Sequence, residues 1–135
     1  GRRLPQTTGG PPPVTATPEA IALAQAAAAA AADKLADDVR AFDVSEHLAI
    51  TDIFVLASAA NDRQVKSIVD EVERQIAAAG GPRPLRVEGL DTMQWVLADY
   101  GSFVVHVFDT ETRAYYDLER LWRDRPIVEW RSAAS

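Results

Sequence analysis

Two groups of residues in this sequence have side chains that could do chemistry. The first group is Trp95, Asp99 and His106, an indole, a carboxylate and an imidazole within one short stretch. If these side chains share a surface, that surface is suited to binding a partner. The second group is Asp109 and Glu111, two carboxylates that follow a run of apolar residues and could hold Mg²⁺ with a nucleotide phosphate.

The first group belongs to a predicted β-hairpin. Two apolar runs rich in Val, Phe and Trp, residues 94–99 and 102–108, are separated by Tyr100-Gly101. This pattern is typical of two antiparallel strands joined by a tight turn. With Tyr100-Gly101 as a two-residue loop, the facing pairs on one side are Trp95 and His106, Leu97 and Val104, and Asp99 and Ser102.

The two sides of this hairpin differ in character. One side carries only apolar residues and is predicted to be core: Val96, Ala98, Phe103, Val105 and Val107. The other side mixes Trp95, Asp99 and His106 with aliphatic residues, which is unusual for a face that binds nothing. The ordinary alternatives stay open, because a tryptophan on a strand commonly packs beneath a helix and a single histidine is commonly a structural residue.

Helices are predicted on either side of the hairpin. Thr17 is a predicted N-cap before Pro18, so a helix is expected to begin there and to run to about Asp38. A second helix is expected from Asn61, with Gln64 in the capping-box position, to residues 80–82, Gly-Gly-Pro. A third is expected over residues 110–121.

Further strands are predicted at residues 39–44, 53–57 and 85–87, while residues 127–130 fit either a short edge strand or a surface segment. The strand–helix–strand arrangement makes 53–57 and 85–87 parallel. The elements together predict an α/β (α+β) fold. It consists of a single domain, residues 15–135, with a mixed β-sheet of about five strands and helices packed on it.

Composition limits the classes of protein. Residues 1–14 hold four of the eight prolines and three of the seven glycines, and are expected to be a flexible tail or an expression remnant. The chain has no cysteine, which excludes disulfides, thiol chemistry and cysteine metal sites. No apolar run approaches the roughly 18 residues needed to span a membrane, so a soluble, cytoplasmic protein is expected.

Charge and motifs argue for a protein partner rather than for catalysis. From residue 15 onward the chain has 12 basic and 20 acidic residues, a net charge of −8, which disfavours binding to a phosphate backbone and favours a basic protein. The sequence contains no HExxH, GxGxxG, P-loop or GxSxG motif. Asp109 and Glu111 remain a weak Mg²⁺ pattern, for which a solvated turn is the alternative, so neither enzymatic activity nor a cofactor is expected.

Six segments, in order, carry a resemblance to a known family. They are TDIFVLAS at 51–58, NDRQV at 61–65, VEG at 87–89, WVLADYG at 95–101, VVHVF at 104–108 and YDLERLW at 116–122. On these segments the chain resembles the Iojap/RsfS family of ribosomal silencing factors from about Thr17 to Pro126. One such motif is a weak signal, whereas six in the family's order and spacing are a strong one.

The resemblance implies a fold related in shape to nucleotidyltransferases and a ribosomal silencing factor that binds the large ribosomal subunit through its fourteenth protein. Such a protein sterically blocks joining of the small subunit, represses translation, and often forms a homodimer when free. The residues expected at its partner-binding surface are Trp95, Leu97, Asp99, Tyr100, Gly101 and His106. The alternative function is a Mg-dependent nucleotidyltransferase-like enzyme that uses Asp109 and Glu111.

Overall fold

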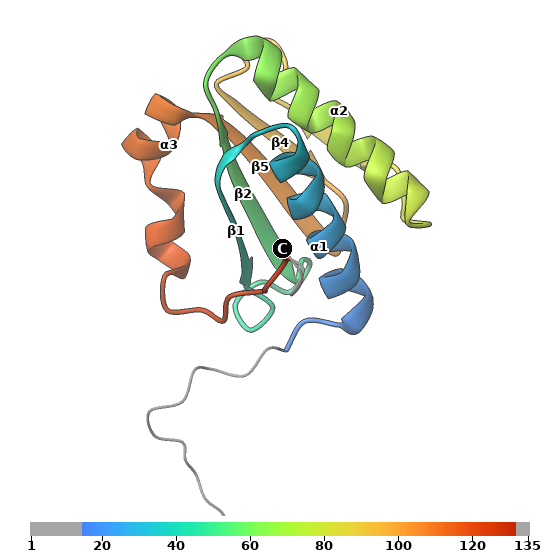
Figure 1. The fold of residues 1–135 in the computed structure, drawn as a ribbon. Helices are drawn as coiled ribbons and strands as arrows, with labels where there is room; N and C mark the ends of the chain where they lie inside the picture. Colours follow the sequence, from blue (N-terminus) through green and yellow to red (C-terminus); the bar gives the residue numbers. More distant parts are fainter. Residues whose placement is uncertain (1–14, 132–135) are drawn as a thin grey trace, which may run out of the picture.

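A five-stranded mixed sheet organises the fold of the computed structural model, which describes residues 15–131 (Figure 1). From one edge to the other the strands are β1 (Asp37–Asp43), β2 (Ile53–Ala59), β5 (Phe103–Asp109), β4 (Trp95–Asp99) and β3 (Arg86–Glu88). β2 and β5 are parallel, and the other neighbouring pairs are antiparallel. β2 and β3 are therefore parallel, as predicted, with β5 and β4 between them. The predicted tail, residues 1–14, lies outside the described residues.

Two helices cover one face of this sheet (Figure 1). α1 (Pro18–Asp33) packs on β1 and β2, α2 (Asp62–Ala78) packs on β5 and β4, and the two helices contact each other. The alanines of α1 allow close approach, since the separation of packed helices follows the size of their contact residues. The predicted apolar stripe of α2 is buried: Val65, Ile68, Val69, Val72 and Ile76. No helix within residues 15–131 has the length and apolarity to cross a bilayer.

The starts of both helices confirm the predicted caps. Thr17 Oγ1 accepts a hydrogen bond from the backbone N–H of Ala20 at 3.1 Å, and Asn61 Oδ1 accepts from that of Gln64 at 2.9 Å. The predicted end of α1 is wrong, because the helix stops at Asp33 rather than near Asp38. Leu35 fits the helical period, but it adopts a left-handed conformation with φ of 64° and begins the turn into β1.

The β4–β5 hairpin forms, but its register differs by two residues from the predicted one. Trp95 lies opposite Phe108, and Leu97 lies opposite His106. A shift of two leaves every side chain on its predicted face, because alternate residues of a strand point to the same side. The predicted core side is therefore correct, and it is buried beneath the helices: Val96, Ala98, Phe103, Val105 and Val107.

The turn of the hairpin explains the shift. Its two-residue loop is Gly101-Ser102, closed by a hydrogen bond from Tyr100 N to Phe103 O at 3.0 Å. Gly101 has φ of 88°, a conformation that glycine adopts without steric cost. Tyr100 is buried rather than in the loop, and its ring stacks on Phe103 with 4.8 Å between centroids. Burial of this ring moves the loop one residue along the chain.

The predicted helix over residues 110–121 is broken in two. α3 spans Thr110–Tyr116, and the 3-10 helix η1 spans Leu118–Trp122. Asp117 lies between them in a left-handed conformation, with φ of 48°. The break directs η1 onto the second face of the sheet, the face that α1 and α2 leave uncovered. There Leu118 and Trp122 pack against a buried cluster of four residues: Phe42, Val44, Leu56 and Phe108.

A buried arginine holds η1 on the second face of the sheet. The Arg113 side chain donates to the carbonyl of Asp38 at 2.6 Å and to Ser58 Oγ at 2.8 Å, and its Nε donates to Glu119 Oε2 at 3.1 Å. These bonds join α3 to β1, β2 and η1. Because one planar guanidinium makes all of them, η1 has a fixed position relative to the sheet.

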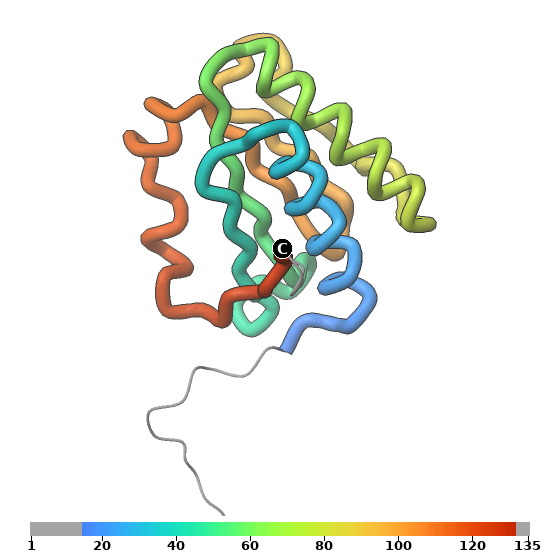
Figure 2. The backbone as a smooth tube through the Cα atoms, in the orientation of Figure 1, coloured from blue at the N-terminus to red at the C-terminus, as the bar shows by residue number. Residues whose placement is uncertain are grey.

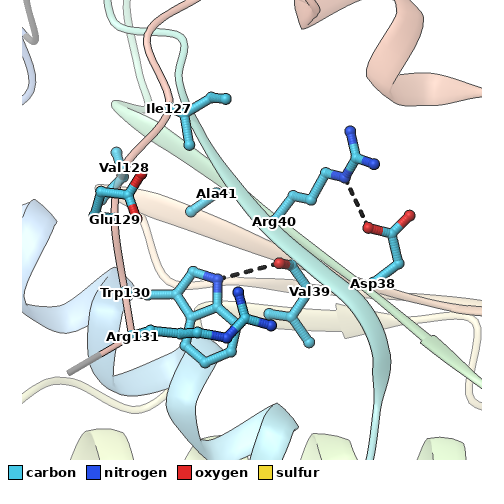
Figure 3. A pocket seen from close by; sticks show the side chains of 9 residues that line it. All are labelled: Asp38, Val39, Arg40, Ala41, Ile127, Val128, Glu129, Trp130 and Arg131. Carbon is cyan, nitrogen blue, oxygen red and sulfur yellow. Dashed lines mark hydrogen bonds and ion pairs between the residues drawn. The ribbon is translucent and has the colours of Figure 1, made fainter. Parts of the chain in front are cut away.

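The segment after η1 covers the outer edge of β1, so residues 127–130 form a partial edge strand. Figure 2 shows this end of the described chain running beside β1 toward α1. Two backbone bonds join it to β1: Asp43 N to Pro126 O at 2.8 Å and Val128 N to Ala41 O at 2.9 Å. Farther along, the Trp130 indole N–H donates to Val39 O at 3.1 Å, in place of a backbone bond (Figure 3). This edge of the sheet is thus protected from pairing with other chains.

Candidate functional site

The second face of the sheet is only partly covered. η1 lies over its β1–β2 side, whereas the side formed by β5, β4 and the start of β2 carries an open groove of about 330 Å³. The apolar side chains that line this groove are Leu48, Ile50, Phe54, Leu85, Leu97 and Val104. A mostly apolar hollow with a few polar groups is the usual form of a binding site on a folded domain.

Large apolar side chains stand exposed at the rim of the groove. Ile50 is 88% exposed and Leu85 is 73% exposed. At the other end of β4, the half-buried ring of Trp95 lies 5.1 Å from that of Tyr116, which is itself 55% exposed. Grouped exposed apolar residues of this kind are characteristic of surfaces that bind another macromolecule.

Trp95 is held in place by His106. The indole N–H donates to His106 Nδ1 at 3.1 Å. Burial lowers the pKa of His106 to about 4, so the imidazole is neutral at pH 7. Since Nδ1 accepts, the proton of the neutral ring is on Nε2. Phe54 packs its ring edge-on against the imidazole, at 4.7 Å between centroids, and completes the support of the tryptophan.

The hairpin turn at the other end of the groove is built by Asp99. Its Oδ1 accepts from the backbone N–H of Gly101 at 2.8 Å, and its Oδ2 lies 3.6 Å from Arg86 Nε. The carboxylate therefore shapes the turn and pairs with β3. Only 22% of its side chain is exposed.

The structure brings five of the six predicted surface residues to this face. Trp95, Leu97 and Asp99 are partly exposed there, Gly101 lies at the turn, and His106 lines the groove although it is only 3% exposed. The sixth residue, Tyr100, is a correction. Its side chain is 4% exposed on the opposite face, in the core beneath α1 and α2, because the shifted loop leaves it within the strand pairing.

Sequence reasoning missed the residues that complete the groove. Ile50 and Thr51 come from the connection between β1 and β2, and Leu85 comes from the segment before β3. The one local signal was a pair of large apolar residues, Leu48 and Ile50, in the connection formed by residues 45–52. Nothing local in the sequence indicates that this connection lies beside the hairpin.

The second chemical group, Asp109 and Glu111, forms a helix start. Asp109 Oδ1 accepts from the backbone N–H of Thr112 at 2.7 Å as the N-cap of α3, and Glu111 lies exposed in the first turn. Within residues 15–131 there is no cluster of three or more acidic, histidine or cysteine residues able to hold a metal ion. These carboxylates are accounted for by capping and by the helix dipole.

Known proteins resemble this chain over most of its length. The family described as ribosomal silencing factor during starvation, RsfS, matches residues 17–134. The ribosomal silencing factor RsfS of Bacillus subtilis (strain 168) is 39% identical over 97 residues, which are 72% of this chain and 81% of that protein. The Mus musculus protein named mitochondrial assembly of ribosomal large subunit protein 1 is 31% identical over 90 residues, 64% of this chain and 39% of that one.

A crystal structure of a Chromobacterium violaceum protein has the same fold. It superposes with a TM-score of 0.72 at 30% identity and covers 84% of this chain and 94% of its own. The family match spans the sheet, the helices and the groove, and it includes all six segments that carry the resemblance. The chain belongs to the ribosomal silencing factor family, RsfS.

Proposed function

We propose that this protein binds the large ribosomal subunit through its fourteenth protein and represses translation by blocking the joining of the small subunit. The family and the names of its relatives support this proposal: bacterial relatives are named ribosomal silencing factors, and the mouse relative is named for assembly of the ribosomal large subunit. Steric occlusion requires only a well-anchored docking surface. It makes no demand on catalytic residues.

The observation that carries the proposal is the arrangement of Trp95. Its ring is half-buried, its N–H is bound to His106, and His106 lines a groove whose rim exposes Ile50 and Leu85. Binding energy in protein interfaces is concentrated in such rigid aromatic residues surrounded by apolar contacts. We therefore assign the docking surface to Trp95, Leu97, Asp99, Gly101 and His106, together with the groove.

The charge of the chain supports a basic protein as the partner. The net charge of −8 from residue 15 onward attracts basic proteins and repels naked RNA. Opposite charges on two partners chiefly raise the rate of association and limit the choice of partner. The contact is thus with ribosomal protein rather than with ribosomal RNA.

The same surface serves a homodimer in the free protein. Ile50, Leu85 and Tyr116 leave more apolar surface exposed than an isolated cytoplasmic monomer favours. Self-association through this face would cover it, so dimerisation and ribosome binding compete. Forced dimerisation that raises the affinity for the ribosome would contradict this part of the proposal.

Sedimentation with isolated ribosomal subunits tests the function. The protein is mixed with large subunits, with small subunits, and with both. We expect co-sedimentation with large subunits alone and fewer joined ribosomes in the mixture. Trp95→Ala should lose both effects, while Trp130→Ala, a matched change at the β1 edge, should keep them. Binding without any loss of joined ribosomes would remove the occlusion mechanism, and absence of binding would remove the proposed function.

A further inference from the structure

Two buried polar atoms in the groove have no hydrogen-bond partner within the described residues. They are Thr51 Oγ1 and His106 Nε2, and both residues line the groove. Thr51 is 6% exposed and His106 is 3% exposed, so neither atom is compensated by solvent. Buried polar groups in folded proteins are almost always paired, so two unpaired ones in a single groove need an explanation.

The two atoms come from different parts of the groove. Thr51 precedes β2 and lies near the hairpin turn, where Asp52 N donates to Ser102 O at 2.8 Å. His106 lies farther along β5, opposite Leu97 of β4. The unpaired atoms are thus spaced along the groove, as the polar contacts of an extended chain segment would be.

The bond to Trp95 determines what His106 can offer. Because Nδ1 accepts the indole N–H, Nε2 of the neutral ring is a donor. Its missing partner is therefore an acceptor, such as a main-chain carbonyl. The Thr51 hydroxyl can donate or accept. The walls around both atoms are apolar and partly exposed at Leu48 and Leu97. An occupant must combine an apolar side chain with main-chain polar atoms.

We propose that the groove receives an apolar side chain of the docking ribosomal protein, whose adjacent main-chain carbonyl accepts a hydrogen bond from His106 Nε2, while Thr51 Oγ1 bonds to the same segment. The inference rests on the proposed function and assigns the chemistry of recognition at its surface. His106 has two roles in it: it positions Trp95 through Nδ1 and selects the partner through Nε2.

A protein segment fits the groove better than other occupants. The groove adjoins the Trp95 surface through His106, so one partner can contact both. The acidic charge disfavours RNA. Since the two polar atoms are not reached by solvent, the side chains that line the groove must shift before the partner can make these bonds. Docking therefore widens a groove that is already open.

The main test is Thr51→Val, measured as affinity for isolated large subunits and as melting temperature. Valine keeps the shape of threonine and removes the unpaired hydroxyl, so the free protein should melt at the same temperature or higher. The affinity should fall about three- to tenfold, the typical value of one hydrogen bond. Thr92→Val, at an exposed position outside the groove, should change neither quantity.

Two further variants separate the roles of His106. His106→Asn keeps an acceptor near the position of Nδ1 for the Trp95 indole and removes the Nε2 donor, so it should bind less tightly. His106→Gln places an amide N–H near the position of Nε2 and should recover part of the lost affinity. A merely structural role for His106 predicts no such recovery.

The outcomes distinguish this inference from the function on which it rests. Normal binding by Thr51→Val would overturn the inference, while loss of binding in Trp95→Ala alone would leave the proposed function intact. An effect of Thr51→Val on self-association but not on ribosome binding would make a second copy the occupant and also overturn it. If the unaltered protein fails to bind large subunits, both fail together.

Discussion

The two faces of the sheet are built from alternate residues of the same strands, yet they differ in kind. Beneath α1 and α2 lie alanines and aliphatic residues, closely packed around the stacked rings of Tyr100 and Phe103. The second face holds Trp95, His106 and Phe54, and its open groove is lined by Thr51 and His106, which each carry an unpaired polar atom. The first face forms the larger part of the core, and we assign partner binding to the second.

Under the proposed function, the two faces of one sheet serve different tasks. Strand alternation lets each residue of β4 and β5 contribute to only one face. Val96 and Val105 therefore pack beneath the helices, while Leu97 and His106 line the groove on the other face. Substitutions on the two faces should consequently affect different measurements.

The largest expected effect is on the helix-covered face. Phe103→Ala removes a ring that is fully buried against Tyr100 and should lower the free energy of unfolding by about 3–5 kcal/mol. Leu97→Ala, at a partly exposed position on the second face, should lower it by less than about 1 kcal/mol. Urea denaturation measures both. Equal losses would contradict the division between the faces.

Acid should lower the free energy of unfolding because His106, on the second face, becomes protonated when the chain unfolds. Burial lowers its folded pKa to about 4 from the ordinary 6.5, so between these values the unfolded chain binds more protons than the folded one. The stability from a neutral His106 is fully present above pH 6.5 and is lost as the pH falls toward 4. The loss amounts to about 3 kcal/mol. Urea midpoints between pH 7 and 4.5 measure it, and His106→Asn should flatten the change.

The buried carboxylate of Asp43 affects stability in a lower pH range than His106 does. Burial of Asp43 would raise its pKa, but hydrogen bonds from Ser45, Ala16 and Thr15 outweigh that effect and hold the pKa below 3.8. Its contribution to stability is present above pH 3.8 and is lost only below that value. A loss of stability between pH 6.5 and 4 therefore reports His106 and not Asp43.

Trp95→Ala should affect binding more than folding. Removing the half-buried ring should weaken ribosome binding by about 2 kcal/mol or more, because aromatic residues of this kind are the usual hot spots. Thermal melting of the variant should stay cooperative, since the packing beneath α1 and α2 is untouched. Unfolding of Trp95→Ala would show that the ring belongs to the core, and normal binding would show that the docking surface lies elsewhere.

Features that depend on neighbouring residues in the sequence were predictable. The N-caps Thr17 and Asn61 are local hydrogen-bond patterns, and both are confirmed. The two faces of the hairpin follow from strand alternation, which survives even the two-residue error in register. The aromatic half of the candidate site, Trp95 and His106, was found for this reason.

Features that depend on distant contacts were not predictable. The groove needs Ile50 and Leu85, which reach the hairpin only through the tertiary fold. The break after α3 follows from Arg113, which bonds to residues of β1 and β2 that are remote in sequence. Periodicity alone extended α1 through Leu35, because a pattern of spaced apolar residues cannot show where the backbone turns.

The smallest expected change in the free energy of unfolding is at Leu35. This residue also allows a comparison between exposed apolar residues inside and outside the groove. Leu35 is 80% exposed like Ile50, but it lies at the end of α1, away from the groove, with φ of 64°. Its carbonyl accepts from Gln64 Nε2 at 3.0 Å, so the backbone keeps this conformation whatever the side chain. Leu35→Gly should therefore raise the free energy of unfolding by about 0.5–1 kcal/mol, since glycine adopts this region without strain. Ribosome binding should not change, whereas Ile50→Ser should weaken it. Equal effects of the two changes on binding would mean that exposed apolar surface in general, rather than the groove, attracts the partner.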